Sequence, residues 1–245
     1  MEKNANAQSS QQSHTQVNLQ PQLQTQPIPR MEEEPFIRNV YCVGRNYRLH
    51  AAELANDVPA SPMLFLKPTH ATTTIADGIL PLPGNQGAVH YETELVLRVG
   101  RSYQPGMSVD ELFSHVTVGL DLTLRTVQDV LKAKGHPWLA AKGFRHSAPL
   151  GRWQVYPGEE SLVCADFGLH LNGREVQRGN ISDMVFGLKE LADYVEEVYG
   201  LGPGDVLFTG TPAGVGPLAD GDELVWWRGD AVLGRAKVVM HPGFL

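Results

Sequence analysis

Short apolar runs rich in β-branched and aromatic residues recur between residues 39 and 239, and this pattern limits the folds open to the chain. The runs that we expect to form strands are 39–43, 63–67, 93–99, 116–122, 162–171, 206–209, 223–227 and 232–239. Turn signals such as Asn172-Gly173 and Pro203-Gly204 separate them. The pattern therefore predicts a domain dominated by strands.

Helical patterns are fewer than strand patterns. The windows that favour helices are 47–55, 108–113, 124–134 and 188–199. These windows do not alternate regularly with the strands, which argues against a doubly wound parallel sheet. We expect a mixed, strand-dominated α+β domain, for which 245 residues that are 42% hydrophobic are sufficient.

The start of the chain has a different composition. Residues 1–30 hold eight Gln, with Ser, Asn and Pro between them and few aliphatic residues. Such a segment cannot bury enough apolar surface to fold, so we expect a disordered tail over 1–35 and a folded domain over 36–245. No run approaches the roughly 18 apolar residues of a membrane helix, and no signal peptide is visible. These features predict a cytoplasmic protein that does not enter a membrane.

The charge and the cysteines exclude several classes of site. The net charge of -7, with a pI near 5.7, argues against nucleic-acid binding, although a locally positive pocket for a small anion remains open. Cys42 and Cys164 lie far apart without CxxC spacing, which excludes a disulfide framework and a thiolate zinc site. We interpret both as small buried apolar residues in a reducing compartment.

Two acidic residues stand at the beginning of one expected strand. Glu92 and Glu94 are two apart, so on a strand their side chains face the same side. Adjacent carboxylates repel unless a cation lies between them or one is protonated. A site for Mg²⁺ or Mn²⁺ is one interpretation, and a solvated strand edge is the other.

Polar residues stand at the end of the expected strand 116–122 and in the helical window after it. Asp121 is a third carboxylate, and its place before a helical window also suits a helix cap. Arg125 and Gln128 are three apart and share one face of that helix. They suit either a carboxylate ligand beside a metal or an ordinary solvated helix face.

Further candidates lie elsewhere in the chain. If 47–55 is helical, Glu53 can orient His50 as a general base, although an ordinary surface pair fits equally. Lys67 and Lys142 stand in apolar surroundings, where a lysine is costly unless paired or snorkelling. The glycine-rich segment 208–216 follows a strand, and its backbone amides either cradle a carboxylate or form a structural turn.

Seven segments carry a more specific signal. They are GRNYRLHAAEL (44–54), SPMLFLKP (61–68), HYETELVLRVG (90–100), GLDLTLRTVQD (119–129), GHPWLAAKGF (135–144), LNGREVQ (171–177) and LGPGDVLFTGTPAGVGPL (201–218). In this order, over residues 38–240, they resemble the fumarylacetoacetate hydrolase family, specifically its short single-domain branch of acylpyruvate hydrolases and oxaloacetate decarboxylases.

The resemblance implies a β-roll-like fold of twisted mixed sheets, a catalytic domain over 36–245 and a homodimer. By resemblance, the metal ligands for Mg²⁺ or Mn²⁺ are Glu92, Glu94 and Asp121. The implied catalytic residues are the dyad His50 and Glu53, on a short lid, and Lys142. The implied substrate-binding residues are Lys67, Arg125, Gln128 and Thr211.

The activity implied by the resemblance is metal-dependent hydrolysis of a C–C bond in a 2,4-dioxo acid, with release of pyruvate. Oxaloacetate decarboxylation, keto–enol tautomerisation and double-bond isomerisation use similar chemistry and are alternatives, and a non-catalytic binding protein is a remote one. The sequence departs from the family pattern at Thr126, where many relatives have Asp, and in the run 143–146 beside Lys142. Neither departure affects the carboxylates or the dyad.

Overall fold

The computed structural model describes residues 36–53 and 59–243, so the predicted Gln-rich tail lies outside the described residues. The strands are β1 (Val40–Gly44), β2 (Met63–Lys67), β3 (Thr72–Thr74), β4 (Gly78–Pro83), β5 (Val89–Tyr91), β6 (Thr93–Val99), β7 (Phe113–Leu120), β8 (Thr123–Leu124), β9 (Ala148–Leu150), β10 (Gln154–Val155), β11 (Phe167–Leu171), β12 (Arg174–Gly179), β13 (Val206–Phe208), β14 (Gly216–Pro217), β15 (Glu223–Arg228) and β16 (Ala231–His241). The α-helices are α1 (Arg48–Glu53), α2 (Val109–Leu112), α3 (Arg125–Ala133), α4 (Leu139–Lys142), α5 (Glu159–Val163) and α6 (Leu188–Tyr199), with 3₁₀ turns η1 (Thr69–Ala71) and η2 (Ile181–Asp183).

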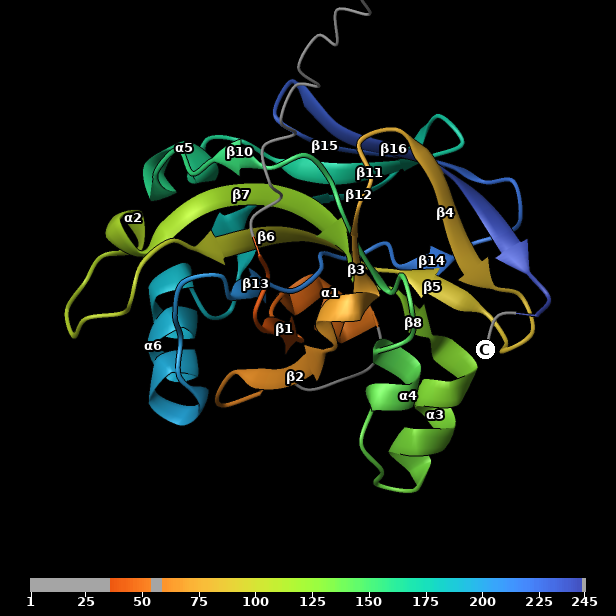
Figure 1. The fold of residues 1–245 in the computed structure, drawn as a ribbon, viewed down its shortest axis with the longest axis horizontal. Helices are drawn as coiled ribbons and strands as arrows, with labels where there is room; N and C mark the ends of the chain where they lie inside the picture. The colour runs from red at the N-terminus through yellow and green to blue at the C-terminus, as the bar shows by residue number, and fades with distance from the viewer. Residues whose placement is uncertain (1–35, 54–58, 244–245) are drawn as a thin grey trace, which may run out of the picture. The chain divides into compact units, whose positions relative to one another are not determined.

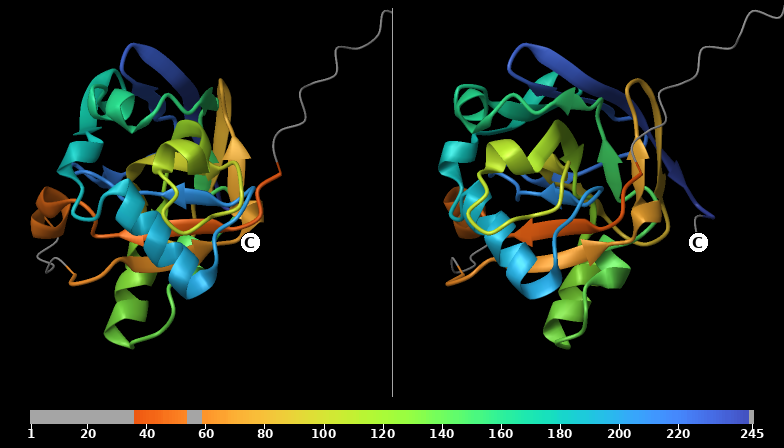
Figure 2. Two further views of the ribbon diagram at one scale, coloured as in Figure 1. Left: turned by 90° about the vertical axis from the view of Figure 1, so that its left-hand side faces the viewer. Right: turned by 60° about the vertical axis from the view of Figure 1, so that its left-hand side comes forward.

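The strands form three sheets, of which the two larger are of mixed direction and the smallest is antiparallel (Figures 1 and 2). An eight-stranded sheet has the order β2-β1-β13-β6-β7-β9-β3, and β10 pairs with β7 outside this path. A five-stranded sheet has the order β12-β11-β15-β16-β4, and a small sheet has the order β14-β5-β8. Most pairs are antiparallel, while β1–β13, β3–β9 and β4–β16 are parallel. The strand-dominated α+β fold predicted from the sequence is therefore confirmed.

The two faces of β6 belong to two different parts of the core. Leu95 and Leu97 pack in the larger apolar cluster, which also contains residues of the five-stranded sheet and so lies between the two large sheets. Val96 points to the opposite face, where it packs in a smaller cluster with Cys42 and Phe208. This is the alternation expected for a strand. Both faces of the strand are buried, so the carboxylate of Glu94 projects into the protein interior and not into solvent.

Most expected strands and helices are present, with one correction at residues 162–171. This segment was predicted as one strand, but residues 159–163 form α5 and β11 begins only at Phe167. Glu159 and Glu160 occupy the first helical turn, where acidic side chains are favourable, and they precede the apolar run that suggested a strand. β4 was not predicted because it contains prolines, which it tolerates as the edge strand paired with β16.

The cysteines differ from one another. Cys42 is buried in β1, as predicted, but Cys164 is exposed, which contradicts the interpretation of both as buried residues. The reason is that α5 ends at residue 163 and leaves Cys164 at its C-terminus, outside the sheet. Within 36–53 and 59–243, no helix combines the length and the apolar character needed to cross a membrane.

Candidate active site

The three predicted metal-binding carboxylates meet where β6 begins and β7 ends. These strands are antiparallel, with Thr93 opposite Leu120, and the amide of Asp121 donates a 2.8 Å hydrogen bond to the carbonyl of Glu92. Strand pairing therefore brings Asp121 beside the Glu92-x-Glu94 pair, although the two segments are distant in sequence. All three side chains are buried, and one oxygen of each lies within 4.8 Å of the others.

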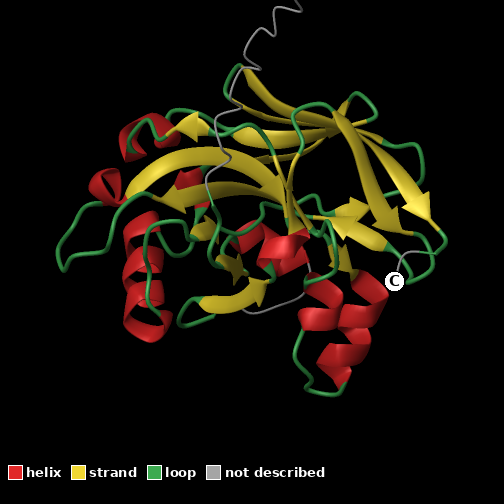
Figure 3. Cartoon of the chain, in the orientation of Figure 1, coloured by secondary structure: helices red, strands yellow, loops and turns green. Residues whose placement is uncertain are grey.

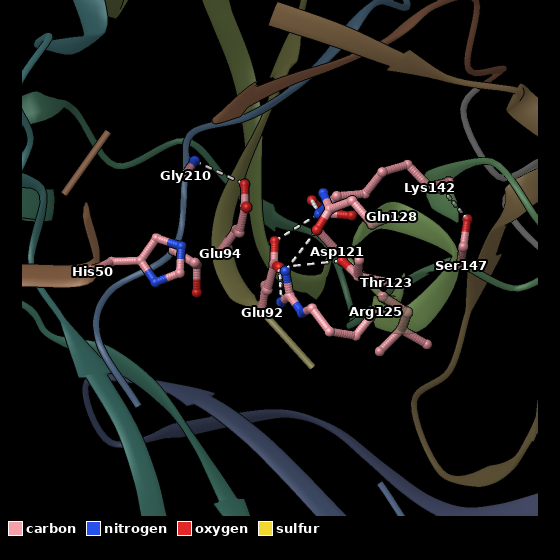
Figure 4. A network of polar contacts seen from close by, with 12 residues as sticks. His50, Glu92, Glu94, Asp121, Thr123, Arg125, Gln128, Lys142, Ser147 and Gly210 are labelled. Carbon is pink, nitrogen blue, oxygen red and sulfur yellow. Dashed lines mark hydrogen bonds and ion pairs between the residues drawn. The ribbon is translucent and has the colours of Figure 1, made fainter. Parts of the chain in front are cut away.

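Three cationic side chains neutralise this acidic cluster, and Figure 4 shows two of them, Lys142 and Arg125. Lys142 Nζ, at the end of α4, lies 2.7 Å from Glu92 Oε2 and 2.6 Å from Asp121 Oδ2, so it bridges the two carboxylates. Lys67 Nζ, at the end of β2, lies 2.8 Å from the other oxygen of Asp121. Arg125 donates to Glu92 Oε1 at 2.7 Å. Both lysines are therefore paired inside the protein and do not snorkel to solvent.

Helix α3 presents Arg125 and Gln128 to the cleft from its first turn. The two side chains are hydrogen-bonded at 2.7 Å, which is the contact expected for residues three apart on a helix. The helix begins at Arg125 and its N-cap is Leu124, so the alternative interpretation of Asp121 as the helix cap is wrong. Figure 3 shows α3 beside the short helix α4, which carries Lys142.

Glu92 and Glu94 differ in proton affinity. Burial alone raises the pKa of Glu92, but Lys142 and Arg125 outweigh burial and hold that pKa well below its usual range. Burial and the neighbouring Asp121 raise the pKa of Glu94 well above its usual range, although the Gly210 amide donates to it. Glu92 therefore favours the ionised form, and a cation beside Glu94 would lower the pKa of that carboxyl.

The donor set fits a divalent cation. Carboxylate oxygens are the ligands that Mg²⁺ and Mn²⁺ prefer. The Lys142 ammonium already sits between two of the three side chains, which shows that this position accepts positive charge. Asp121 Oδ1 is buried and receives no hydrogen bond, because its contact with Lys67 lacks hydrogen-bond geometry. A carboxylate oxygen carries more than one lone pair, so Asp121 can keep this ion pair and still coordinate a metal ion.

The His50–Glu53 pair lies on α1, and His50 faces Lys142 across the cleft. Figure 4 shows the His50 ring projecting toward Glu94 and Glu92 from the side opposite Lys142. His50 Nδ1 lies 3.4 Å from Glu53 Oε2, and the Gly214 amide donates to both oxygens of Glu53 at 3.2 Å. Burial lowers the pKa of His50, so its ring is held in the neutral form that can accept a proton.

The glycine-rich segment after β13 does bind carboxylates, and they belong to the protein itself. The Gly210 amide donates to Glu94 Oε2 at 2.7 Å, and the Gly214 amide holds Glu53 as described above. Thr211 stands between them and donates to the carbonyl of Thr93 at 2.9 Å. The segment therefore links a predicted metal ligand to the predicted dyad.

The ten predicted site residues come together, but only eight of them line the cleft and the other two lie behind these. Those that line the cleft are His50, Glu92, Glu94, Asp121, Arg125, Gln128, Lys142 and Thr211. Glu53 lies behind His50, and Lys67 lies behind Asp121 with its ammonium also donating to the carbonyls of Leu122 and Lys142. Lys67 therefore supports the carboxylate, and its contact with substrate stays a prediction.

Several lining residues were not singled out from the sequence. They are Val43, Gly44, Arg45, Met63, Phe65, Lys132 and Trp138. Phe65 and Trp138 lie within segments that carry the family resemblance, so those segments contained a signal for them. Lys132 is an ordinary charged residue of an exposed helix by its pattern, and only the fold places it at the cleft.

One known protein family matches nearly all of the described residues. Residues 39–239 match the family described as fumarylacetoacetate (FAA) hydrolase C-terminal. The chain belongs to the fumarylacetoacetate hydrolase family. This confirms the resemblance noted in the sequence and identifies the strand-rich domain as a family fold.

Relatives within the fumarylacetoacetate hydrolase family carry more than one activity in their names. An oxaloacetate tautomerase of Escherichia coli is 37% identical over 193 residues, which cover 77% of this chain and 87% of the relative. An oxaloacetate decarboxylase of Dictyostelium discoideum is 33% identical over 192 residues, which cover 76% and 87%. A solved fumarylpyruvate hydrolase of Pseudomonas aeruginosa, in complex with Mn²⁺ and pyruvate, is 34% identical with a TM-score of 0.75, covering 86% of this chain and 94% of that one.

Proposed function

We propose that the chain is a divalent-metal-dependent hydrolase that cleaves a C–C bond in a 2,4-dioxo acid and releases pyruvate. The observation that carries this proposal is the buried His50, tied to Glu53 and directed at the acidic cluster from the opposite side of the cleft. Hydrolysis needs a base that activates water, whereas decarboxylation does not. A positioned, neutral imidazole provides such a base.

The acidic cluster would hold the metal through Glu92, Glu94 and Asp121. A divalent ion bound there supplies Lewis-acid polarisation of the substrate's keto oxygen and stabilises the negative charge that develops on it. The Mn²⁺ in the Pseudomonas relative supports a metal of this class. Mg²⁺ and Mn²⁺ both accept oxygen ligands, so either is expected to support activity.

Other residues of the site would bind the substrate, activate water and stabilise the enolate. Arg125, fixed by Glu92 and Gln128, would bind the carboxylate next to the keto group. His50, with Nδ1 toward Glu53, would take a proton from water through Nε2 while the water oxygen adds to C4. The C3–C4 bond then breaks, and its electron pair remains on C3 as an enolate. Lys142 would stabilise that negative charge before C3 is protonated.

A second candidate is keto–enol tautomerisation of oxaloacetate, which the name of the Escherichia coli relative favours. This reaction moves a proton between C3 and the keto oxygen and breaks no C–C bond. It needs the same enolate stabilisation, and the site described above is compatible with it. Decarboxylation of oxaloacetate, favoured by the Dictyostelium relative, breaks the bond from C3 to the carboxylate without added water.

The experiment that separates these reactions uses the full chain with Mg²⁺. We would measure pyruvate released from fumarylpyruvate and from oxaloacetate, and separately the decay of the oxaloacetate enol absorbance. The proposal expects pyruvate from fumarylpyruvate, with a loss of about 100-fold or more in His50→Gln. Acceleration of the enol–keto exchange alone would replace the hydrolase proposal with the tautomerase. Pyruvate from oxaloacetate alone, unaffected by His50→Gln, would indicate the decarboxylase.

A further inference from the structure

The cleft contains more positive charge than its acidic cluster neutralises. Its lining includes four cationic side chains, those of Arg45, Arg125, Lys132 and Lys142, against the three carboxylates. Arg125 and Lys142 are paired with Glu92 or Asp121, as described above. Among the described residues, no carboxylate lies within ion-pair distance of Arg45 or Lys132. A bound divalent cation adds two further positive charges.

A chain of contacts with aromatic rings runs from Lys142, in the metal-binding cluster, to Lys132. Lys142 Nζ lies 5.0 Å from the centre of the Phe65 ring, and Phe65 packs on Trp138 with ring centres 6.0 Å apart. Lys132 Nζ in turn lies 5.5 Å from the centre of the Trp138 ring. The cleft thus has a buried acidic end, an aromatic wall and, beyond that wall, an outer end at the exposed Lys132. Contact with Trp138 also restricts where the Lys132 ammonium can lie.

Arg45 also lines the cleft, and its backbone has an unusual conformation. Its φ of 60° lies in the left-handed region, which non-glycine residues rarely adopt. The next residue, Asn46, fixes the turn, since its buried side chain donates to the carbonyls of Thr209 and Phe186 and accepts from the Phe186 amide. Backbone strain maintained by surrounding contacts is typical of functional sites.

The two cations also affect one another. Burial lowers the pKa of Lys132, and the nearby charges of Arg125 and Arg45 lower it further and outweigh Asp129 and Glu92, which raise it. Arg45 and Lys132, which make no ion pair among the described residues, repel one another. A negatively charged group would relieve this repulsion.

We propose that Arg45 and Lys132 form a second anion subsite at the outer end of the cleft, which binds the distal carboxylate of a dicarboxylic 2-oxo acid. The inference rests on the proposed function, because the metal end would hold the 2-oxo acid group that the substrates share. The aromatic wall of Phe65 and Trp138 then lies beside the carbon chain between the two ends. The preferred substrates are dianions such as fumarylpyruvate, and acylpyruvates with a neutral acyl group are poorer.

The test compares two ligands of equal carbon number, 2-oxoglutarate and 2-oxopentanoate, which end in a carboxylate and a methyl group. Each is titrated calorimetrically into the full chain with Mg²⁺. We expect 2-oxoglutarate to bind about tenfold or more tightly than 2-oxopentanoate. Lys132→Met should remove about tenfold of that preference without changing 2-oxopentanoate binding. Arg45→Met should act in the same direction, and Lys132→Arg should retain the preference.

Lys134→Met is the matched control, because Lys134 is exposed just after α3 and does not line the cleft. It should leave both affinities unchanged. Equal binding of the two ligands by the unaltered chain, or no binding of 2-oxoglutarate, would overturn the subsite. Equal weakening of both ligands in Lys132→Met would also overturn it, because the lysine would then contact the group that the ligands share.

Turnover assays keep this inference separate from the proposed function. Efficient hydrolysis of both fumarylpyruvate and acetylpyruvate, with equal kcat/KM, would support the hydrolase and contradict the subsite. A strong preference for 2-oxoglutarate in a chain that hydrolyses neither substrate would support the subsite and contradict the hydrolase. The subsite and the reaction type can therefore fail independently.

Discussion

Lys142 Nζ lies 2.6 Å from Asp121 Oδ2, and neither side chain is more than 3% exposed. The same ammonium lies 2.7 Å from Glu92, so the lysine holds together two side chains that would otherwise repel. The neighbouring carboxylates raise the pKa of Lys142 and outweigh burial, which lowers it. The metal-free protein therefore neutralises its candidate metal site with a resident cation.

Removing that cation should make stability more dependent on metal. Lys142→Met leaves two buried carboxylates without a shared partner, so we expect the metal-free variant to unfold at a lower temperature than the unaltered chain. Because Mg²⁺ or Mn²⁺ would then relieve more repulsion, the rise in unfolding temperature on adding metal should be larger in the variant. Thermal unfolding with metal and with a chelator measures both. An equal rise in the two proteins would contradict the bridging role.

Lys67 should matter for stability even though it lies outside the cleft lining. Its side chain is fully buried, and Lys67→Met removes one partner of Asp121 while Lys142 remains as the other. We expect a loss of about 2–3 kcal/mol in the free energy of unfolding, less than for a buried charge left with no partner. Urea denaturation measures the loss. Lys189→Met is the control, because its ion pair with Asp193 is exposed and should contribute little.

The lowered pKa of His50 predicts the pH dependence of the reaction. Because the folded protein keeps the ring neutral below its ordinary pKa of 6.5, the acid limb of kcat/KM should have its midpoint below that value. The unfolded chain binds the proton at higher pH than the folded chain. His50 therefore makes stability fall as pH decreases below about 6.5, and His50→Gln should remove this part of the decrease. An acid limb above 6.5 would contradict a buried, neutral base.

The Gly214 amide should be needed to position the dyad. Gly214 has a φ of 102°, and a Cβ at this position would lie 2.2 Å from the carbonyl oxygen of Val176. Gly214→Ala should displace the amide that holds Glu53 and lower kcat by about tenfold or more, with little change in Mn²⁺ affinity.

Glu53→Gln tests the same contact without altering the backbone, and it should lower kcat in the same way. Gly202→Ala is the matched control for Gly214→Ala and should leave kcat unchanged, since nothing lies within 4 Å of a Cβ at Gly202. A large loss of Mn²⁺ affinity in Glu53→Gln would show that Glu53 acts on the metal and not through His50.

Local patterns predicted the parts of the site that depend on local geometry. Spacing alone placed Glu92 and Glu94 on one side of a strand, Arg125 with Gln128 on a helix face, and His50 within reach of Glu53. The first pair is buried in one cluster, and both of the other pairs are in contact. The family resemblance, and not periodicity, brought Asp121 into the same set.

The remaining features depend on long-range pairing that periodicity does not contain. The β6–β7 register decides that Asp121 lies beside Glu92, and the packing of β2 decides that Lys67 lies behind Asp121. Cys164 was misassigned because the apolar run 162–171 contains the end of a helix. Lys132 shows no distinguishing local pattern, because its importance comes from Trp138 and the cleft around it.

The central claim is that Glu92, Glu94 and Asp121 bind a divalent cation. A Mn²⁺ titration of the chelator-treated full chain, followed by the loss of the free Mn²⁺ electron paramagnetic resonance signal, tests it most directly. We predict one bound Mn²⁺ per chain, as expected from the acidic cluster in the described residues, and no binding in the same range for Glu94→Gln. Failure of the unaltered chain to bind Mn²⁺, or unchanged binding by Glu94→Gln, would contradict the metal site.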